Sequence, residues 1–181
     1  MRRVVVIGVA GSGKSTVARA LSERLDAPHI ELDAIFWQPN WTKLDEDEFA
    51  ARVAAATATG PWIADGNYSQ RIRQITWPAA DTIVWLDLPR PVIMWQLLRR
   101  TIHRTRTGTE LWNGNHERAL KDQLSRDPAK SILLWSWRTY TPTKREYAEA
   151  MNDPRYAQVT FVRLKSRRQI RKVLESIGNQ P

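Results

Sequence analysis

One stretch near the start of the chain constrains the fold more than any other. Residues 8–15 read G-V-A-G-S-G-K-S, between a β-branched run at 4–7 and an amphipathic segment that begins at Lys14. This pattern is a buried strand, a glycine-rich turn and a helix start with the spacing G-x-x-x-x-G-K-S. Glycines let the backbone wrap an anion closely, and the N–H groups of the turn and of the helix start then point at it. The stretch therefore predicts a loop that binds the phosphates of a nucleotide.

The same loop assigns roles to particular side chains. We expect Lys14 to reach the β- and γ-phosphates, and the Ser15 hydroxyl to bind Mg²⁺. The expected cofactors are therefore ATP, or another nucleoside triphosphate, together with Mg²⁺. The loop residues assigned to the nucleotide are Gly8, Gly11, Ser12, Gly13, Lys14, Ser15 and Thr16.

The composition fits a single soluble domain. The 181 residues are 42% hydrophobic and 26% charged, which is a normal balance for a domain with its own core. The chain has no cysteine, which excludes disulfides and thiolate metal sites and suits a reducing cytoplasm. No apolar run approaches the length of a membrane-spanning helix, and the phosphate loop stands where a signal peptide would have its apolar region. We predict one cytoplasmic domain over residues 1–181 that has no membrane partner.

The net charge of +9 concerns the partners of the protein rather than its fold. An anionic nucleotide uses part of this charge, and nucleic acid is a second candidate partner. The nine tryptophans are many for this length. Most are expected in the core, and some are expected to stack on a planar ligand.

Strand-like and helix-like segments alternate along the whole chain, without a repeat or a linker. Short apolar runs predict strands at about residues 3–8, 29–32, 62–66, 81–89 and 158–164. The other segments predict helices at about 14–25 and 45–57, helices that begin at about 67 and 90, and further helices at about 116–125, 129–140 and 166–178. The helix at 129–140 is expected to continue to about 151 after an interruption at Pro142. Right-handed crossovers between such strands give a five-stranded parallel sheet with helices on both faces, a three-layer α/β fold.

Two aspartates stand where a ligand is expected. Asp33 follows the second predicted strand and Asp65 ends the third. In open α/β sheets, ligands bind beyond the carboxyl ends of the strands. Asp65 is therefore placed to hold Mg²⁺ or its water shell, or alternatively to cap the helix that follows. The aromatic residues of segment 34–41 form either a small satellite core or a wall for the second substrate.

Arginines crowd the end of the helix that begins at residue 90. Cations at a helix C-terminus are favourable in themselves, but this cluster exceeds what the helix dipole needs. Arg100 and Arg104 lie four residues apart on one face, and the guanidinium group suits a phosphate clamp. The glycine-punctuated stretch 107–115 follows. Its composition is typical of a mobile loop, and we predict that it forms a lid.

Taken together, these segments resemble the small P-loop kinases, the superfamily of nucleoside monophosphate kinases and shikimate kinases. Within it, the chain is most similar to bacterial adenylate kinase-related proteins of the DNA topology modulation type. The similarity lies in the loop at 8–15, L-D at 32–33 followed by F-W, W-I-A-D-G-N-Y at 62–68, T-I-V-W-L-D-L-P at 82–89 and W-S-W-R at 135–138. It implies the strand order 2-3-1-4-5, a lid over about 104–118 and an acceptor-binding segment over about 33–60.

The resemblance also implies the roles of residues outside the loop. The expected catalytic residues are Lys14, Asp33, Arg100 and Arg104. Arg106 would join the nucleotide site, and Asp65 would join Ser15 at the metal. The acceptor site would consist of Asp33, Trp37, Gly66, Asn67, Tyr68 and Arg71.

The chain departs from the kinase pattern at one place. Nucleoside monophosphate kinases have D-G-F-P-R after the third strand, whereas this chain has D-G-N-Y-S at 65–69. The arginine that would hold an acceptor phosphate is therefore missing, and either Arg71 or Arg73 replaces it or the acceptor is not a nucleotide. The expected function is ATP- and Mg²⁺-dependent phosphoryl transfer to a small acceptor, with nucleoside monophosphates among the candidates. The alternatives are a nucleotide-dependent nucleic-acid-binding or regulatory protein, and a simple NTPase.

Overall fold

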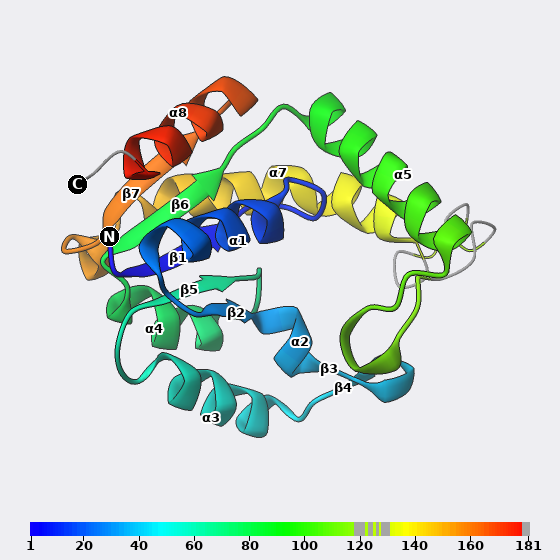
Figure 1. Cartoon of the computed structure of the whole chain (residues 1–181), viewed down its shortest axis with the longest axis horizontal. Helices are drawn as coiled ribbons and strands as arrows, with labels where there is room; N and C mark the ends of the chain where they lie inside the picture. The colour runs from blue at the N-terminus through cyan, green and yellow to red at the C-terminus, as the bar shows by residue number, and fades with distance from the viewer. Residues whose placement is uncertain (118–121, 123–124, 126, 128–130, 179–181) are drawn as a thin grey trace.

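A five-stranded parallel sheet forms the centre of the protein (Figure 1). The computed structural model describes residues 1–117, 122, 125, 127 and 131–178. Across the sheet the strands follow the order β2 (His29–Glu31), β5 (Trp62–Asp65), β1 (Arg3–Ile7), β6 (Thr82–Leu86) and β7 (Thr160–Leu164). Numbered among themselves, these strands have the order 2-3-1-4-5, as the resemblance implied.

Helices cover both faces of the sheet, which confirms the three-layer prediction. Val4 and Val6 of β1 face α1 (Lys14–Leu25) and α8 (Arg167–Gly178) on one side. Val5 and Ile7 face α4 (Gln70–Ala79) and α7 (Ile132–Ala150) on the other. Successive strand residues point to opposite faces, so a strand that is buried on both sides must be apolar throughout.

A smaller unit follows β2 in the chain. It consists of α2 (Leu32–Phe36), a hairpin of β3 (Trp37–Gln38) and β4 (Thr42–Lys43) with the short helix η1 (Pro39–Trp41) between them, and α3 (Glu46–Thr57). A second apolar core joins this unit to α4, through Leu32, Phe49, Val53 and Ile72. Phe36 packs against this core, so the satellite-core alternative holds for part of the aromatic segment.

Helix α5 (Arg90–Thr107) leads away from the sheet and packs against α7. Gly108, in the left-handed conformation, ends it. The predicted interruption of α7 at Pro142 is wrong, because α7 runs unbroken from Ile132 to Ala150. Packing holds this helix on both sides of the proline: Tyr140 donates to the carbonyl oxygen of Leu88, and Tyr147 is buried in the main core. Most of the helix expected at 116–125 lies outside the described residues.

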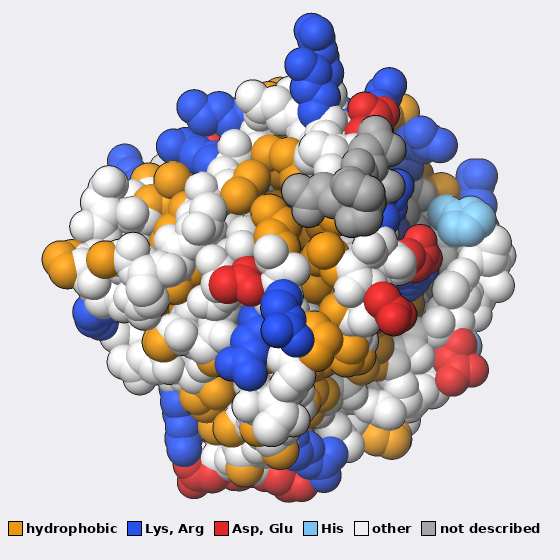
Figure 2. Space-filling view, turned by 60° about the vertical axis from the view of Figure 1, so that its left-hand side comes forward, with side chains coloured by type: hydrophobic (Ala, Val, Ile, Leu, Met, Phe, Trp, Pro, Cys, Tyr) orange, Lys and Arg blue, Asp and Glu red, His pale blue; other side chains and the backbone are white. Residues whose placement is uncertain are grey.

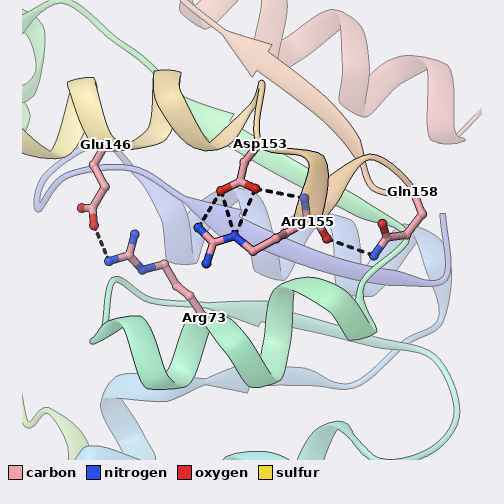
Figure 3. Close-up of polar contacts among 5 residues, drawn as sticks. All are labelled: Arg73, Glu146, Asp153, Arg155 and Gln158. Carbon is pink, nitrogen blue, oxygen red and sulfur yellow. Dashed lines mark hydrogen bonds and ion pairs between the residues drawn. The ribbon is translucent and has the colours of Figure 1, made fainter.

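One ion pair links α4 to α7, and a second lies within the turn that leads to β7 (Figure 3). Arg73 of α4 donates to the carboxylate of Glu146 on α7, and its guanidinium lies 5.7 Å from the Trp77 ring centroid. In the turn, the short helix η3 (Pro154–Tyr156) is capped by Asp153, whose carboxylate also accepts from the guanidinium of Arg155 at 2.6 Å. Arg73 is therefore engaged in packing two helices together.

In the part of the chain that the structure describes, none of the helices is long and apolar enough to span a membrane.

Asp81 links the N-terminal ends of β1 and β6, and its replacement tests how much this link stabilises the sheet. Its carboxylate accepts from the N–H groups of Arg2 (2.6 Å) and Arg3 (2.9 Å) and from the Thr82 hydroxyl (2.7 Å). Burial by itself would raise the pKa of Asp81, but these hydrogen bonds outweigh it and hold the pKa below its ordinary value.

We expect Asp81→Asn to lower the free energy of unfolding by about 0.5–1 kcal/mol at neutral pH, since the site is partly exposed. The folded-state pKa lies below the unfolded one. The stabilisation is therefore present above about pH 4 and disappears as the pH falls through the folded-state pKa. Urea unfolding of both proteins at about pH 7 and about pH 3 measures the difference. An equal loss at both pH values would contradict this account.

Candidate active site

The phosphate loop, residues 8–15, lies between β1 and α1 and is shaped to surround an anion. Gly11 and Gly13 have φ angles of +88° and +93°, which side-chain-bearing residues rarely adopt. A Cβ on Gly11 would lie 2.8 Å from the Cβ of Leu97, so α5 also needs a glycine there. Within the described chain, no side chain caps α1 at Gly13, and its first turn has no acidic residue. The N–H groups of that turn are therefore available to a phosphate.

Two polar side chains hold the loop from outside. Ser136 of α7 is buried, and its hydroxyl donates to the carbonyl oxygen of Ala10 at 2.8 Å. Asn67, which follows β5, donates to the carbonyl oxygen of Gly8 at 2.5 Å and accepts from its N–H group at 3.3 Å. Asn67 was assigned to the acceptor, and the structure places it against the nucleotide loop.

Lys14 extends from the loop toward three other charged groups. Its Nζ donates to the carbonyl oxygen of Val9 at 3.3 Å. Burial lowers the pKa of Lys14, the nearby carboxylates of Asp33 and Asp65 oppose that shift, and Arg100 adds to it. Asp33, Asp65 and Arg100 therefore lie close enough to Lys14 to affect its pKa. Of these four residues, Asp65 is predicted as a metal ligand and the other three as catalytic.

Asp65 and Ser15 provide two adjacent oxygen atoms. The Ser15 hydroxyl donates to Oδ2 of Asp65 at 2.6 Å, and Asp65 is 5% exposed. Oxygen ligands of this kind suit Mg²⁺. Among the described residues there is no group of three or more His, Cys, Asp or Glu side chains that would hold a metal alone. A magnesium ion here would take its other ligands from nucleotide phosphates and water. Asp65 is not the cap of α4, because Ser69 occupies the N-cap position.

Asp33 lies in the first turn of α2, not at the end of a strand as predicted. The pairing of β2 with β5 ends at Glu31, because Leu32 turns into the satellite core. Burial raises the pKa of Asp33; the hydrogen bond from Tyr68 and the charges of Lys14 and Arg100 oppose the shift, and Asp65 adds to it. Burial and the same carboxylate raise the pKa of Tyr68, which therefore stays protonated and donates to Asp33.

The predicted arginines of α5 differ in their surroundings. Burial lowers the pKa of Arg100. The positive charge of Arg104 lowers it further, whereas the charges of Glu117 and Asp33 oppose the shift. The buried Nε of Arg100 has no hydrogen-bond partner among the described residues. A half-buried guanidinium with a buried, unpaired donor suits an anionic ligand. Arg104 is held by Glu117, with Nη1 3.6 Å from Oε2.

An open groove of about 670 Å³ lies along α5, and Arg100 is one of its lining residues. With the Gln96 amide oriented to satisfy its neighbours, its nitrogen donates to the carbonyl oxygen of Gly11 at 2.7 Å. Its oxygen then accepts from Nη2 of Arg167 at 2.9 Å. The bond to Gly11 links the groove to the phosphate loop. The groove is lined by Trp95, Gln96, Arg99, Arg100, Ile102, His103, Arg106, Thr107 and Arg167.

The predicted lid is fastened to the predicted acceptor segment. The loop after α5 reaches β3 and β4, as Figure 1 shows, and contains the short helix η2 (Trp112–Gly114). Asn113 donates to the carbonyl oxygens of Ala34 (3.1 Å) and Trp37 (2.5 Å). The Trp41 ring packs edge-on against Trp112, and its Nε1 donates to the carbonyl oxygen of His116 at 3.0 Å. In this structure the predicted lid is docked against the hairpin.

Asn115 is the most buried polar contact between lid and hairpin, and its loss should loosen both together. Its amide accepts from the N–H group of Trp41 (2.7 Å) and donates to the carbonyl oxygen of Gln38 (2.9 Å). We expect Asn115→Ala to cost about 1–3 kcal/mol of local stability. Amide hydrogen exchange should then accelerate in residues 37–43 and 108–116 alike. Thr109→Ala, an exposed change in the same loop, is the matched control. Faster exchange in only one segment would contradict joint docking.

The remaining predicted residues lie at different distances from this centre. Gly66 is buried, and a Cβ there would lie 2.9 Å from the Cβ of Leu32. Trp37 is half-buried and packs edge-on against Phe36. Thr16 is exposed on α1. The structure places Arg71 apart from the group, on the surface, where its Nη1 lies 2.5 Å from Oδ1 of Asp47.

Sequence reasoning missed several residues that touch the site. Ser136 stands inside W-S-W-R, which marked the resemblance without indicating a role. Gln96 and Arg167 connect the groove to the loop, and Glu117 pairs with Arg104. His29 lies 2.9 Å from Asp65 through Nε2. A lone histidine in a short strand carries no motif, so only the pairing of β2 with β5 reveals it.

Comparisons with known proteins agree with the fold. No family model matches the chain. The chain is 24% identical to the uncharacterized protein YqaC of Bacillus subtilis (strain 168) over 140 residues, which are 75% of this chain and 71% of that protein. Its structure is similar to a gluconokinase from Sinorhizobium meliloti 1021, with a TM-score of 0.54, 20% identity and coverage of 97% and 89% of the two chains.

Two further kinase structures give similar values. Shikimate kinase from Acinetobacter baumannii, in complex with shikimate, has a TM-score of 0.53 and 16% identity, and the match covers 98% of this chain and 90% of that enzyme. A sugar kinase from Janibacter sp. HTCC2649 has a TM-score of 0.50 and 18% identity with the same coverage. At these identities the similarity establishes the fold. The chain therefore has the α/β fold of the P-loop small-molecule kinases, as its sequence predicted.

Proposed function

We propose that this protein transfers the terminal phosphoryl group of ATP, in the presence of Mg²⁺, to a hydroxyl group of a small acceptor. The observation that carries the proposal is the placement of Asp33. A half-buried carboxylate whose pKa is raised lies close to the lysine of a phosphate-binding loop, and a protonated tyrosine orients it. Phosphoryl transfer needs groups that position the reactants and neutralise charge, and these residues supply both.

Each residue of the centre has a role in this proposal. Lys14 and Arg100 stabilise the negative charge on the moving phosphoryl group. Asp33 orients the acceptor hydroxyl and accepts its proton, while Tyr68 keeps the carboxylate in place. Ser15 and Asp65 would hold Mg²⁺, which would neutralise negative charge on the phosphates. The docked lid excludes water, which limits wasteful hydrolysis of ATP.

The groove along α5 is the proposed site of the nucleotide base and ribose. Its volume of about 670 Å³ is in the range of small-molecule sites. It is rich in cations, and Gln96 connects it to the phosphate loop. Trp95, which is 59% exposed, offers an aromatic face for a base. Arg106 lines this groove, which supports the proposal that it contacts the nucleotide.

The negative charge of Asp33 favours a hydroxyl over a phosphate as the group that is phosphorylated. A nucleoside monophosphate presents a dianionic acceptor, which a neighbouring carboxylate repels. The two candidates to replace the missing arginine are both engaged elsewhere: Arg71 pairs with Asp47, and Arg73 pairs with Glu146. Nucleoside monophosphates are therefore the second acceptor class in this proposal.

The direct test is ATP turnover with and without a panel of acceptors. Hydroxylated metabolites, nucleosides and nucleoside monophosphates are each offered with Mg·ATP. The proposal predicts that some hydroxylated compounds raise the rate of ADP formation at least about tenfold, because a bound acceptor replaces water as the nucleophile. Equal turnover with every compound and with none would instead indicate a simple NTPase.

Nucleic acid is the second candidate partner, because of the net charge of +9. On the face that Figure 2 shows, Lys and Arg side chains occur in separate groups among acidic and apolar side chains. Several arginines elsewhere are also neutralised in ion pairs, such as Arg155 with Asp153 and Arg163 with Asp87. Weak DNA binding that fades at physiological salt fits the kinase proposal. A sub-micromolar affinity with a steep salt slope would favour the nucleic-acid alternative.

A further inference from the structure

A histidine stands behind the oxygen pair that is proposed to hold magnesium. His29 and Glu31 lie on the same face of β2, two residues apart. The Nε2 atom of His29 lies 2.9 Å from Oδ1 of Asp65, and its Nδ1 lies 3.7 Å from Oε1 of Glu31. The His29 side chain is only 12% exposed. The ring is therefore enclosed between two carboxylates.

The two oxygens of Asp65 are divided between different partners. Oδ2 accepts from the Ser15 hydroxyl at 2.6 Å, and Oδ1 faces Nε2 of His29. An ionised carboxylate can only accept hydrogen bonds, so this contact requires the hydrogen on Nε2. With both oxygens engaged, the carboxylate cannot rotate freely.

The other side of the ring is also held. Oε2 of Glu31 accepts from Nε1 of Trp112 in the lid at 2.7 Å, and Oε1 lies 3.6 Å from the guanidinium of Arg19. Glu31 is therefore held in place by the lid and by α1, and its carboxylate faces Nδ1 of His29. Residues that orient a metal ligand from behind commonly change metal affinity by about 10- to 100-fold when they are lost.

We propose that His29 is a positioning residue for magnesium binding: its Nε2–H holds one oxygen of Asp65 so that the other stays at Ser15 and at the metal. The inference rests on the proposed function, because it takes Ser15 and Asp65 as the magnesium site. It assigns a role to a residue that no motif of the chain indicates.

The experiment measures ATP binding by calorimetry, with saturating Mg²⁺ and with EDTA. The ratio of the two affinities gives the contribution of the metal without any catalytic turnover. We expect His29→Leu to reduce this ratio about tenfold, with the affinity in EDTA unchanged. His29→Gln, whose amide nitrogen can occupy the place of Nε2, should keep the ratio within about threefold of the wild-type value. His29→Asn, whose shorter amide cannot reach Asp65, should behave like the leucine variant and replaces it if His29→Leu does not fold.

Asp65→Asn is the reference that separates this inference from the proposed function. A reduced ratio in Asp65→Asn with an unchanged ratio in His29→Leu or His29→Asn would overturn the role of His29 and leave the metal site standing. An unchanged ratio in Asp65→Asn would refute the metal site itself, and the inference with it. Equal losses in the glutamine, asparagine and leucine variants, also in EDTA, would assign His29 to packing alone.

Discussion

Replacement of Lys14 by methionine is expected to reduce phosphoryl transfer from ATP at least about a hundredfold. The ammonium group lies among Asp33, Asp65 and Arg100 and is the only cation that the phosphate-loop motif itself contributes. Removal of one preorganised charge from a developing oxyanion commonly has an effect of this size. Steady-state rates with saturating Mg·ATP and an identified acceptor provide the measurement.

The methionine side chain keeps most of the volume of lysine, so the fold should persist in this variant. Circular dichroism and a cooperative thermal transition check that it does. Lys172→Met, an exposed change on α8, serves as the matched control and should retain full activity. A Lys14→Met protein that is folded and transfers phosphate at the wild-type rate would show that Lys14 of the phosphate loop takes no part in phosphoryl transfer.

Replacement of Asp33 by asparagine is the second change with a large expected effect, a loss of about 10²- to 10⁴-fold in kcat/KM. The amide cannot accept the proton of an acceptor hydroxyl. Because burial raises the pKa of Asp33, the wild-type rate should fall on the acid side at a higher pH than an ordinary carboxylate would give. Tyr68→Phe removes a hydrogen bond that lowers this pKa, so its acid limb should move to still higher pH. A limb that stays in place in Tyr68→Phe would contradict the role of Asp33 as the base.

The raised pKa of Asp33 predicts that the Asp33→Asn variant, although less active, is more stable than the wild type at neutral pH. A carboxyl group whose folded-state pKa lies above its unfolded value favours the fold when protonated and loses that advantage as the pH rises through the folded-state pKa. At neutral pH, ionised Asp33 therefore opposes folding. We expect Asp33→Asn to unfold at a higher temperature than the wild type at pH 7, and thermal melts of the two proteins measure this. A lower midpoint would show that the carboxylate is held for stability.

Much of the fold follows from local rules that the sequence displays openly. Apolar runs with β-branched residues define the strands that are buried on both faces, and the loop spacing places α1 directly after β1. Asp45 caps α3 because a side-chain acceptor at that position satisfies the N–H groups of Asp47 and Glu48. Interactions of this kind involve neighbours in the chain, so the pattern of residues is sufficient to predict them.

The site depends on contacts between distant segments, which a linear pattern does not contain. Asp33 was placed at a strand end because the apolar run seemed to continue through Leu32; the satellite core turns that residue inward instead. Asn115 meets Trp41 across a gap of more than seventy residues in the chain. His29 meets Asp65 only because β2 pairs with β5. Arg71 is near the expected place in the sequence, but in the structure it pairs with Asp47 of α3.

The central claim is that a hydroxyl group receives the phosphoryl group beside Asp33. Phosphorus NMR of the reaction mixture tests it most directly, with Mg·ATP and the panel of hydroxylated compounds, nucleosides and nucleoside monophosphates. The account predicts a new phosphomonoester resonance that grows with ADP in the wild-type reaction and is absent from the Lys14→Met and Asp33→Asn reactions. Formation of inorganic phosphate alone, or of a nucleoside diphosphate from a monophosphate at equal rates in wild type and Asp33→Asn, would contradict it.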